Sequence, residues 1–399
     1  MLVDRGRTHW RRLSVLGLRP KQSTSPDLDT ASGIAGAREA LQPGKPLDPR
    51  AVFARRDTFT GGHSDKPLLV PMMESAGVFM ARGVGSIAGA KKVRITPSDG
   101  SPPIIVEALR AVIIATGSEP LYPNIEGLKE ADPWTPRDAT SSSTVPEHLI
   151  VVGAGAVGTE MAFAYASFGS KITLIGGGEE IIPSVDPRAG AIVREALMAL
   201  GATVRTGSRV VEVSQKDEVV TVKLAGGDVF TGTEILLAAG RKPKSQMLDL
   251  ESVGVSLDQK GYIPVNDNLM VRGTDWLYAG GDVVNRGQLT HTSKYHARIM
   301  SNVILAENKI GNDWSSTSAT ADRLALPQVI FTHPPVASVG LSTKAAAAKG
   351  IKVREVTAPF ASLGSRIASD NAVDGWAQWL VDDHNVLVGA TFVGPGADE

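Results

Sequence analysis

One stretch near the middle of the chain, HLIVVGAGAVGTEMAFAYASFGSKITLI at residues 148–175, predicts a strand, a glycine-rich turn, a helix and a second strand. Its turn contains Gly153, Gly155 and Gly158. The first glycine suits the tight turn, the second leaves room for a pyrophosphate, and the third lets the helix pack close to the strand. The helix N-terminus favours the phosphate charge. With an apolar strand before the turn and an amphipathic helix expected after it, the stretch predicts a dinucleotide-binding unit. The alternative is a glycine-rich turn that binds no ligand.

The same stretch leaves the choice between NADH and NADPH open. In such units an acidic residue about 20 residues further on binds the ribose 2′-hydroxyl of NAD, whereas a nearby arginine accommodates the 2′-phosphate of NADP. The position at the end of the second strand is Gly176, followed by Gly177 and Gly178. Glu179 can reach around to the ribose, but no arginine stands beside it in the sequence. We therefore expect shallow discrimination between the two coenzymes.

Composition excludes several other classes of function. The 399 residues suit two or three domains, and 42% hydrophobic with 21% charged residues are ordinary for a globular protein. A net charge of −1 gives no global attraction to nucleic acid or membrane, and no apolar run reaches the roughly 18 residues that span a bilayer. The absence of cysteine excludes disulfides and thiolate metal sites, and His291 and His296 do not share a helix face as paired metal ligands would. We expect no metal site, no nucleic-acid partner and no membrane partner.

The beginning of the chain differs in composition from the rest. Residues 1–22 carry five Arg and one Lys against one Asp. Such a start is compatible with an organelle transit peptide, with a disordered basic tail or with a mis-set gene start. Residues 22–34 are polar and turn-forming, and predict a linker. We expect residues 1–34 to form a basic tail and linker, and the protein to be cytoplasmic, with mitochondria as the alternative.

Three further strands are predicted to end in turns that suit ligand binding. IIATGSEP contains Thr116 and Gly117, LLAAGRKP contains Gly240, and YAGGDV contains Gly281 and Asp282. An aspartate at the end of a strand can accept hydrogen bonds from ligand hydroxyls. Each motif alone is more often an ordinary turn. Their order along the chain is more specific than any one of them.

In the order IIATGSEP, VVGAGAVGTE, LLAAGRKP, YAGGDV and FTHPPVASVG, the motifs span residues 113–340. In this respect the chain resembles the two-dinucleotide-binding flavoproteins, the pyridine nucleotide-disulfide oxidoreductase family that includes dihydrolipoamide dehydrogenase, glutathione reductase and mercuric reductase. The resemblance implies an α/β fold with two Rossmann-like domains, which bind FAD and NAD(P)H, and an α+β dimerisation domain. The FAD domain would be discontinuous. The implied domains are an FAD domain at 35–145 and 274–322, an NAD(P)H domain at 146–273 and a dimerisation domain at 323–399.

The resemblance also implies roles for individual residues. On the NAD(P)H side, three glycines match the phosphate turn, a glutamate matches the group that approaches the nicotinamide carboxamide, and one backbone position lies beside the same ring: Gly153, Gly155, Gly158, Glu160 and Gly240. Residues that match positions around FAD are Gly85 at the adenine, Thr116 and Gly117 at the nucleotide turn, Gly281 and Asp282 at the ribityl hydroxyls, and His291 at the pyrimidine edge. For Glu160 the alternative is a partly solvated helix residue, and for His291 a structural residue at a helix start. The catalytic residues stay unknown.

The sequence departs from the family pattern in three respects. No GxGxxG motif precedes residue 150, the redox-active cysteine pair is missing, and so is the later His-Glu acid–base pair. We therefore expect a chain truncated at both ends, with an incomplete FAD domain, a partial dimerisation domain and an impaired homodimer. The implied activity is hydride transfer from NAD(P)H to flavin and on to an undefined small-molecule electron acceptor. The alternative is a non-catalytic NAD(P)-binding fragment or sensor.

Overall fold

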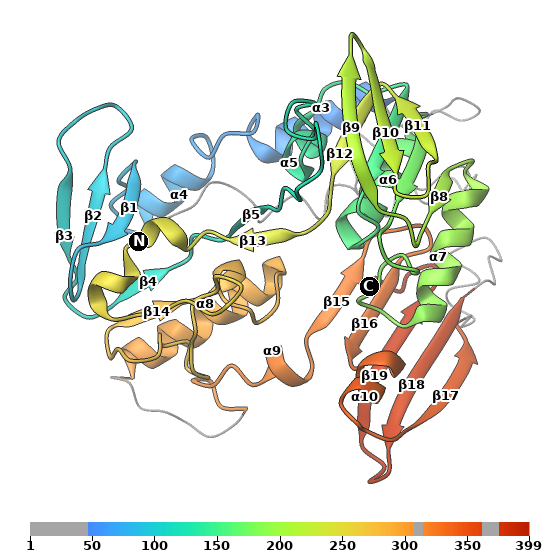
Figure 1. Cartoon of the computed structure of the whole chain (residues 1–399). Helices are drawn as coiled ribbons and strands as arrows, with labels where there is room; N and C mark the ends of the chain where they lie inside the picture. Colours follow the sequence, from blue (N-terminus) through green and yellow to red (C-terminus); the bar gives the residue numbers. More distant parts are fainter. Residues whose placement is uncertain (1–46, 307–313, 361–374, 399) are drawn as a thin grey trace, which may run out of the picture. The chain divides into compact units, whose positions relative to one another are not determined.

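The computed structural model describes residues 47–306, 314–360 and 375–398, so the prediction for residues 1–34 lies outside the described part. The chain forms two compact units, and each combines segments that are distant in the sequence (Figure 1). Unit 1 contains Ser64–Glu119 and Arg241–Leu326. Of the described residues, unit 2 contains 47–63, Pro120–Gly240 and those from Pro327 onward.

A parallel sheet forms the centre of unit 2, with the strand order β12-β6-β7-β8. Its strands are β6 (His148–Val152), β7 (Lys171–Ile175), β8 (Thr203–Arg205) and β12 (Glu234–Leu237). Helix α6 (Ala156–Ser167) connects β6 to β7, and α7 (Pro187–Ala199) connects β7 to β8. This order and these crossovers are those of one mononucleotide-binding half of a Rossmann fold. The strand–turn–helix–strand expected at 148–175 is therefore present.

Helix α6 is buried on most sides, which corrects the expectation of an amphipathic helix. All residues from Gly158 to Tyr165 are buried. Beyond the helix end, Phe168 packs edge-to-face on Phe53 of α3 (Pro49–Thr60), with 5.3 Å between the ring centroids. Tyr165 donates a 2.7 Å hydrogen bond to the carbonyl of Ala139 in α5 (Pro136–Ser141). Because other elements of unit 2 cover its outer face, α6 needs no polar side.

The buried Tyr165 phenol should make the protein less stable at alkaline pH. Burial raises its pKa from 10.0 to about 12, so the folded chain binds the phenol proton more tightly than the unfolded chain. The stabilisation of the folded protein by this phenol is complete at pH values below the pKa of tyrosine in the unfolded chain. It is lost as the pH rises through the higher pKa of Tyr165 in the folded chain. From pH 10 to pH 12 we expect the unfolding free energy to fall by about 2 to 3 kcal/mol more in the parent than in Tyr165→Phe. Urea unfolding across this range measures the difference, and parallel pH dependences would contradict the expectation.

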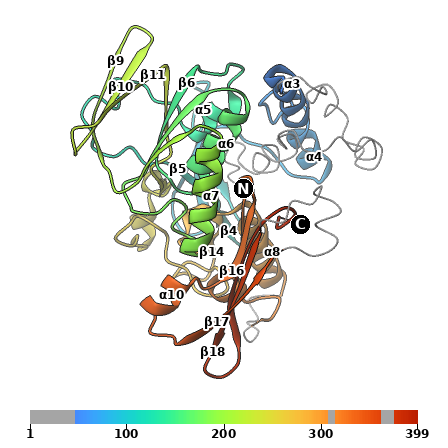
Figure 2. The ribbon, with the colours of Figure 1, turned by 90° about the vertical axis from the view of Figure 1, so that its right-hand side faces the viewer.

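Two antiparallel sheets complete unit 2 (Figures 1 and 2). The first has the order β11-β10-β9, and its Val213, Val220 and Val222 share a core with the parallel strands. The second is five-stranded, with the order β15-β16-β19-β18-β17. The bounds are β9 (Val210–Lys216), β10 (Val219–Leu224), β11 (Val229–Gly232), β15 (Pro327–Ile330), β16 (Val336–Gly340), α10 (Thr343–Ala348), β17 (Val353–Pro359), β18 (Trp376–Asp382) and β19 (Leu387–Val393).

Unit 1 is held together by the parallel pair β4 (Val112–Ile114) and β14 (Leu277–Ala279), which joins its two sequence segments. The turn after β14 forms the short helix η3 (Gly281–Val283) and packs on α8 (Thr290–Leu305). The other elements are α4 (Leu69–Ser75), the antiparallel strands β1 (Val84–Ile87), β2 (Lys92–Thr96) and β3 (Ile104–Glu107), the pair β5 (Ser118–Pro120) and β13 (Arg241–Pro243), η1 (Gln246–Leu248), η2 (Leu250–Val253) and α9 (Ala321–Leu324).

The two units agree with the predicted α/β fold class. The boundary after Gly240 differs from the expected end of the NAD(P)H domain at residue 273. Residues 241–273 fall in unit 1, where η1 and η2 pack on β1 and where β13 pairs with β5, whose Ser118 and Glu119 also belong to unit 1. Helix α3, expected in the FAD domain, belongs to unit 2. The compact units are defined by packing and not by bound cofactors, so the predicted boundaries of the cofactor-binding domains stay predictions. Among the described residues, no helix combines the length and the apolar character that crossing a membrane requires.

Candidate nucleotide-binding sites

The three glycines of the GAGAVG turn meet three different steric conditions. Gly153 has a φ of 117°, and a Cβ there would collide with the carbonyl oxygen of Ala238. A Cβ at Gly158 would collide with the carbonyl oxygen of Gly153, because α6 starts so close to β6. At Gly155 the backbone is ordinary, and apart from its two neighbours along the chain no described residue has an atom within 4 Å of a Cβ position. Two of the glycines are thus required by packing, whereas Gly155 leaves open space.

The open space at Gly155 adjoins the start of α6. Gly155 is the N-cap residue of this helix and offers no side chain to the amides of the first turn. Such amides, together with the helix dipole, attract phosphate groups. The turn can therefore hold a pyrophosphate that approaches over Gly155.

Glu160 and Gly240 lie in unit 2 with this turn. Glu160 is only 4% exposed, and its Oε1 accepts a 3.1 Å hydrogen bond from the backbone N–H of Phe331. It is therefore not a partly solvated helix residue. Gly240 follows β12 with a φ of 125°, and its carbonyl accepts a 3.0 Å bond from the N–H of Leu121.

The end of β7 carries an arginine that the sequence analysis missed. The chain after β8 hydrogen-bonds to the chain after β7, with Gly207 N–H donating to the Gly178 carbonyl at 2.7 Å. The Glu179 carboxylate lies over Gly207, within 3.0 Å of its Cβ position. On the same edge, the Cγ of Arg209 lies 3.8 Å from the Cβ position of Gly177. The Glu179 carboxylate and the aliphatic stem of Arg209 thus lie near the expected ribose position.

In unit 1, Asp282 is held by two residues that the sequence analysis also missed. The hydroxyl of Ser118 donates to Asp282 Oδ2 at 2.6 Å, and it accepts a bond from Arg241 Nε at 2.7 Å. Arg241 Nη2 also donates to the Ser118 carbonyl at 2.6 Å. The Asp282 side chain is 20% exposed. Because its described hydrogen bond uses Oδ2, Oδ1 can accept a bond from a ligand hydroxyl.

The other residues expected around FAD all fall in unit 1, but the structure does not bring all of them together. Gly117, with a φ of 75°, accepts a 2.9 Å bond from Lys244 N–H, and Thr116 donates to the Lys244 carbonyl at 2.5 Å. This turn directly precedes Ser118, the partner of Asp282. Gly85, by contrast, lies in β1 opposite Ile95, in a separate antiparallel sheet.

His291 is exposed in the first turn of α8. This helix starts after Leu289 without a side-chain cap. In the same turn Thr292 Oγ1 is buried and, within the described part of the chain, has no hydrogen-bond partner. Uncapped amides and an orphaned hydroxyl suit a ligand with carbonyl or hydroxyl groups. Together with Asp282 they fit a flavin nucleotide on unit 1.

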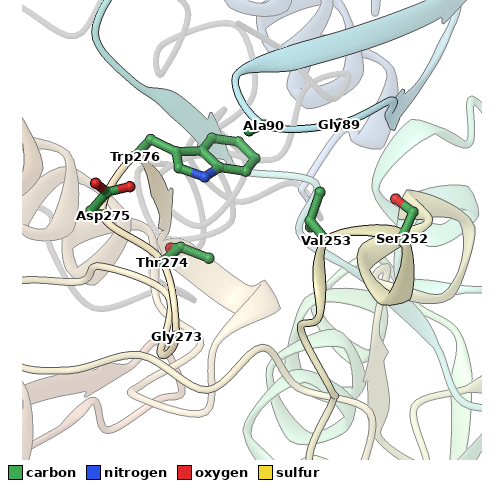
Figure 3. Close-up of a pocket in the computed structure, with 8 residues that line it drawn as sticks. All are labelled: Gly89, Ala90, Ser252, Val253, Gly273, Thr274, Asp275 and Trp276. Atoms are coloured by element: carbon green, nitrogen blue, oxygen red, sulfur yellow. The ribbon is translucent and has the colours of Figure 1, made fainter.

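A groove of about 580 Å³ on unit 1 lies away from these residues (Figure 3). Trp276 stands on one side of it, and Val253 and Ser252 on the other. Trp276 precedes β14, so the groove adjoins the amino end of that strand. Ligands of open α/β sheets bind at the carboxyl ends of the strands, where Asp282 lies. This groove is therefore not the nucleotide site.

Comparison with known proteins gives matches along most of the chain. The family described as pyridine nucleotide-disulphide oxidoreductase matches residues 55–297, and the dimerisation domain of the same family matches residues 326–399. A dihydrolipoyl dehydrogenase from Thermus scotoductus is 30% identical over an alignment of 397 positions, which covers 96% of this chain and 80% of that protein. A dihydrolipoyl dehydrogenase from Geobacillus stearothermophilus is 29% identical over 81% of this chain and 66% of its own length.

Among solved structures, the flavoprotein disulfide reductase RclA from Escherichia coli, as a Cu(II) complex, is similar in fold. The TM-score is 0.76 at 22% identity, over 88% of this chain and 77% of the RclA chain. At this identity the likeness concerns the fold alone.

Proposed function

Because the chain belongs to the pyridine nucleotide-disulphide oxidoreductase family, whose members are FAD-dependent and use NAD(P)H, we propose that it is a flavoprotein oxidoreductase. It would oxidise NAD(P)H and pass the electrons to a small-molecule acceptor. FAD, when bound, supplies the chemistry of accepting a hydride and passing its electrons on. The observation that carries the proposal is the free approach to Gly155 beside the uncapped start of α6. The oxidoreductase chemistry of the full-length relatives is extended to this chain as part of the proposal.

We assign the coenzyme side to unit 2. Gly155 and the first amides of α6 would bind the pyrophosphate, while Gly153 and Gly158 shape the turn. Glu160 and Gly240 would lie beside the nicotinamide.

We assign the flavin side to unit 1. Asp282, held by Ser118, would accept hydrogen bonds from ribityl hydroxyls through Oδ1. The amides at the start of α8, beside His291 and Thr292, would donate to the pyrimidine edge and stabilise negative charge there. Thr116 and Gly117 would shape the nucleotide turn, and Gly85 would line the adenine.

The acceptor is proposed to be a quinone-like small molecule. Within these 399 residues no cysteine is available to carry electrons as a dithiol. A planar quinone needs no covalent intermediate with the protein.

The test is a comparison of flavin content and turnover. We expect purified protein supplied with excess FAD to turn yellow and to oxidise NADH or NADPH with menadione, although the incomplete FAD domain should release the flavin on desalting. Asp282→Ala should lose flavin, whereas Asp275→Ala, an exposed aspartate beside the Figure 3 groove, should not. A colourless protein that still binds NAD(P)H would refute the oxidoreductase and support a coenzyme-binding sensor.

The presence of both Glu179 and Arg209 near the expected ribose position predicts similar affinities for NADH and NADPH. A single substitution should change the ratio of these affinities. Removal of the Arg209 guanidinium should weaken NADPH about three- to tenfold and leave NADH within about twofold, because only NADPH carries a 2′-phosphate. Fluorescence titration of Arg209→Ala with both coenzymes measures this. Arg205→Ala is the matched control, since Arg205 pairs with Asp228 instead. Equal weakening of NADH and NADPH in Arg209→Ala would contradict the assignment.

In place of the impaired homodimer expected from the sequence, we also propose a homodimer, supported by the match of residues 326–399 to the dimerisation domain. The five-stranded sheet carries an aromatic cluster on one face, with Trp379 and Phe392 at 5.6 Å between ring centroids and Phe360 beside Phe392. Sedimentation of the parent and of Trp379→Glu tests it. A parent that stays monomeric at micromolar concentration would refute the dimer.

A further inference from the structure

The turn that carries Asp282 is closed into a ring of hydrogen bonds by three side chains. The N–H of Gly281 donates to His296 Nδ1 at 3.0 Å. The other ring nitrogen, Nε2, lies 2.8 Å from Asp322 Oδ2. Arg286 donates to both oxygens of Asp322, from Nε at 2.9 Å and from Nη2 at 2.7 Å. The segment from Gly281 to Arg286 is thus fastened at both ends to the same His–Asp pair.

The hydrogen-bond directions determine the state of His296. Its Nδ1 accepts from a backbone N–H, so this nitrogen carries no proton and the proton is on Nε2, which donates to Asp322. The side chains of His296 and Asp322 are fully buried, and that of Arg286 is only 12% exposed. Because water is excluded from these side chains, each of their hydrogen bonds contributes to stability. A buried polar group that lacks a hydrogen-bond partner destabilises the folded protein. The ring therefore has one arrangement of protons.

The backbone also fits closely against α8 at this point. A Cβ at Gly280 would lie 3.1 Å from the Cβ of His296 and 2.8 Å from Met300 Cε. Gly281 has a φ of 75°, in the left-handed region. The bond from Gly281 N–H to His296 thus holds a turn that has little other freedom, immediately before Asp282.

We infer that His296 is a positioning residue, which fixes the Gly281–Asp282 turn and thereby aims the Asp282 carboxylate at a ligand hydroxyl. Ser118 holds the carboxylate from one side, and the ring through His296 holds its backbone from the other. A carboxylate fixed in this way binds without first being ordered. The link to a flavin hydroxyl rests on the proposed function, but the clamp itself does not.

Two substitutions at residue 296 separate the two hydrogen bonds of the imidazole. His296→Asn places an amide oxygen near the position of Nδ1, so it keeps an acceptor for Gly281 N–H and loses Asp322. His296→Gln places an amide nitrogen near the position of Nε2, so it keeps a donor to Asp322 and loses the acceptor for Gly281. Lys294→Gln, exposed on the same helix, is the control.

Site-resolved hydrogen exchange of FAD-free protein measures the clamp. We expect the Gly281 amide to exchange at least about tenfold faster in His296→Gln and nearly as slowly as in the parent in His296→Asn. FAD titration should then show a Kd raised about tenfold in His296→Gln only. If His296 only stabilised the fold, the exchange rate of the Gly281 amide and the Kd for FAD would instead change in proportion to the loss of stability of each variant, as measured by its urea unfolding midpoint.

Three outcomes decide between the ideas. Unchanged exchange at Gly281 in His296→Gln overturns the clamp. Faster exchange with unchanged FAD affinity overturns the positioning of Asp282. A parent that binds no FAD refutes the proposed function, while the exchange experiment still decides the clamp.

Discussion

Replacing Gly155 with valine should weaken NAD(P)H binding at least tenfold, a loss of about 1.4 kcal/mol or more, while the protein stays folded. The reason is the difference between this glycine and its neighbours. No described atom lies within 4 Å of a Cβ at Gly155, so a branched side chain finds space in the free protein. That space is where the pyrophosphate would lie. The loss of a glycine at an N-cap position should cost no more than about 1 kcal/mol of stability.

Three control variants make this expectation specific to the turn. Gly226→Val also meets no described atom within 4 Å, but it lies in the turn between β10 and β11 and should bind the coenzyme normally. Gly153→Ala and Gly158→Ala collide with backbone carbonyls and should lose about 3 kcal/mol or more of stability. Isothermal titration and urea unfolding separate the two effects. Parent-like affinity in Gly155→Val would show that the pyrophosphate does not pass over this residue.

Replacing Arg286 with methionine should lower the unfolding free energy of the protein by about 3 to 5 kcal/mol, because it leaves the Asp322 carboxylate buried without its counter-charge. Arg286 also donates to the carbonyls of Asn266 and Ala319 and to Asp267, so its loss leaves backbone acceptors unpaired. Urea unfolding with linear extrapolation measures the change.

The control is Arg323, a second arginine that pairs with Asp267. Arg323 lies 3.0 Å from Asp267 but is 46% exposed, so Arg323→Met should cost no more than about 1 kcal/mol. Adding Asp322→Asn to Arg286→Met should recover part of the loss, since it removes the unpaired charge. Equal effects of the two arginine substitutions would mean that Asp322 is hydrated in the folded protein.

The parts of the fold that the sequence predicted are those encoded over short distances. The GAGAVG turn, its two strands and its helix lie within 28 consecutive residues, from His148 to Ile175, and their periodicity and glycines are local signals. The burial of α6 could not be read this way. Residues of α3 and α5 pack against it, and the sequence of a 12-residue helix does not show which other elements of the fold will cover it.

The residues missed in the candidate sites share one property, which is long separation along the chain from their partners. Arg209 reaches the end of β7 because β8 is the next strand of a parallel sheet, and Ser118 meets Asp282 across 164 positions. The β7–β8 pairing was the one available signal, since it places the residues after both strands on the same edge. Nothing local marks His296 and Asp322 as partners, because their contact exists only after α8 and α9 have docked.

The bond from Leu121 N–H to the Gly240 carbonyl, 3.0 Å long, has a consequence for how such chains are assembled. It joins the second and the last residues of the segment 120–240, which contains the whole parallel sheet of unit 2. A module whose two ends meet can be spliced into a surface connection of a host protein without stretching that host, and the entropy of closing the interrupted loop is modest. The segment to which we assign coenzyme binding therefore has the ends of an insertable domain, and a host protein that lost it would need only a short peptide to close the gap.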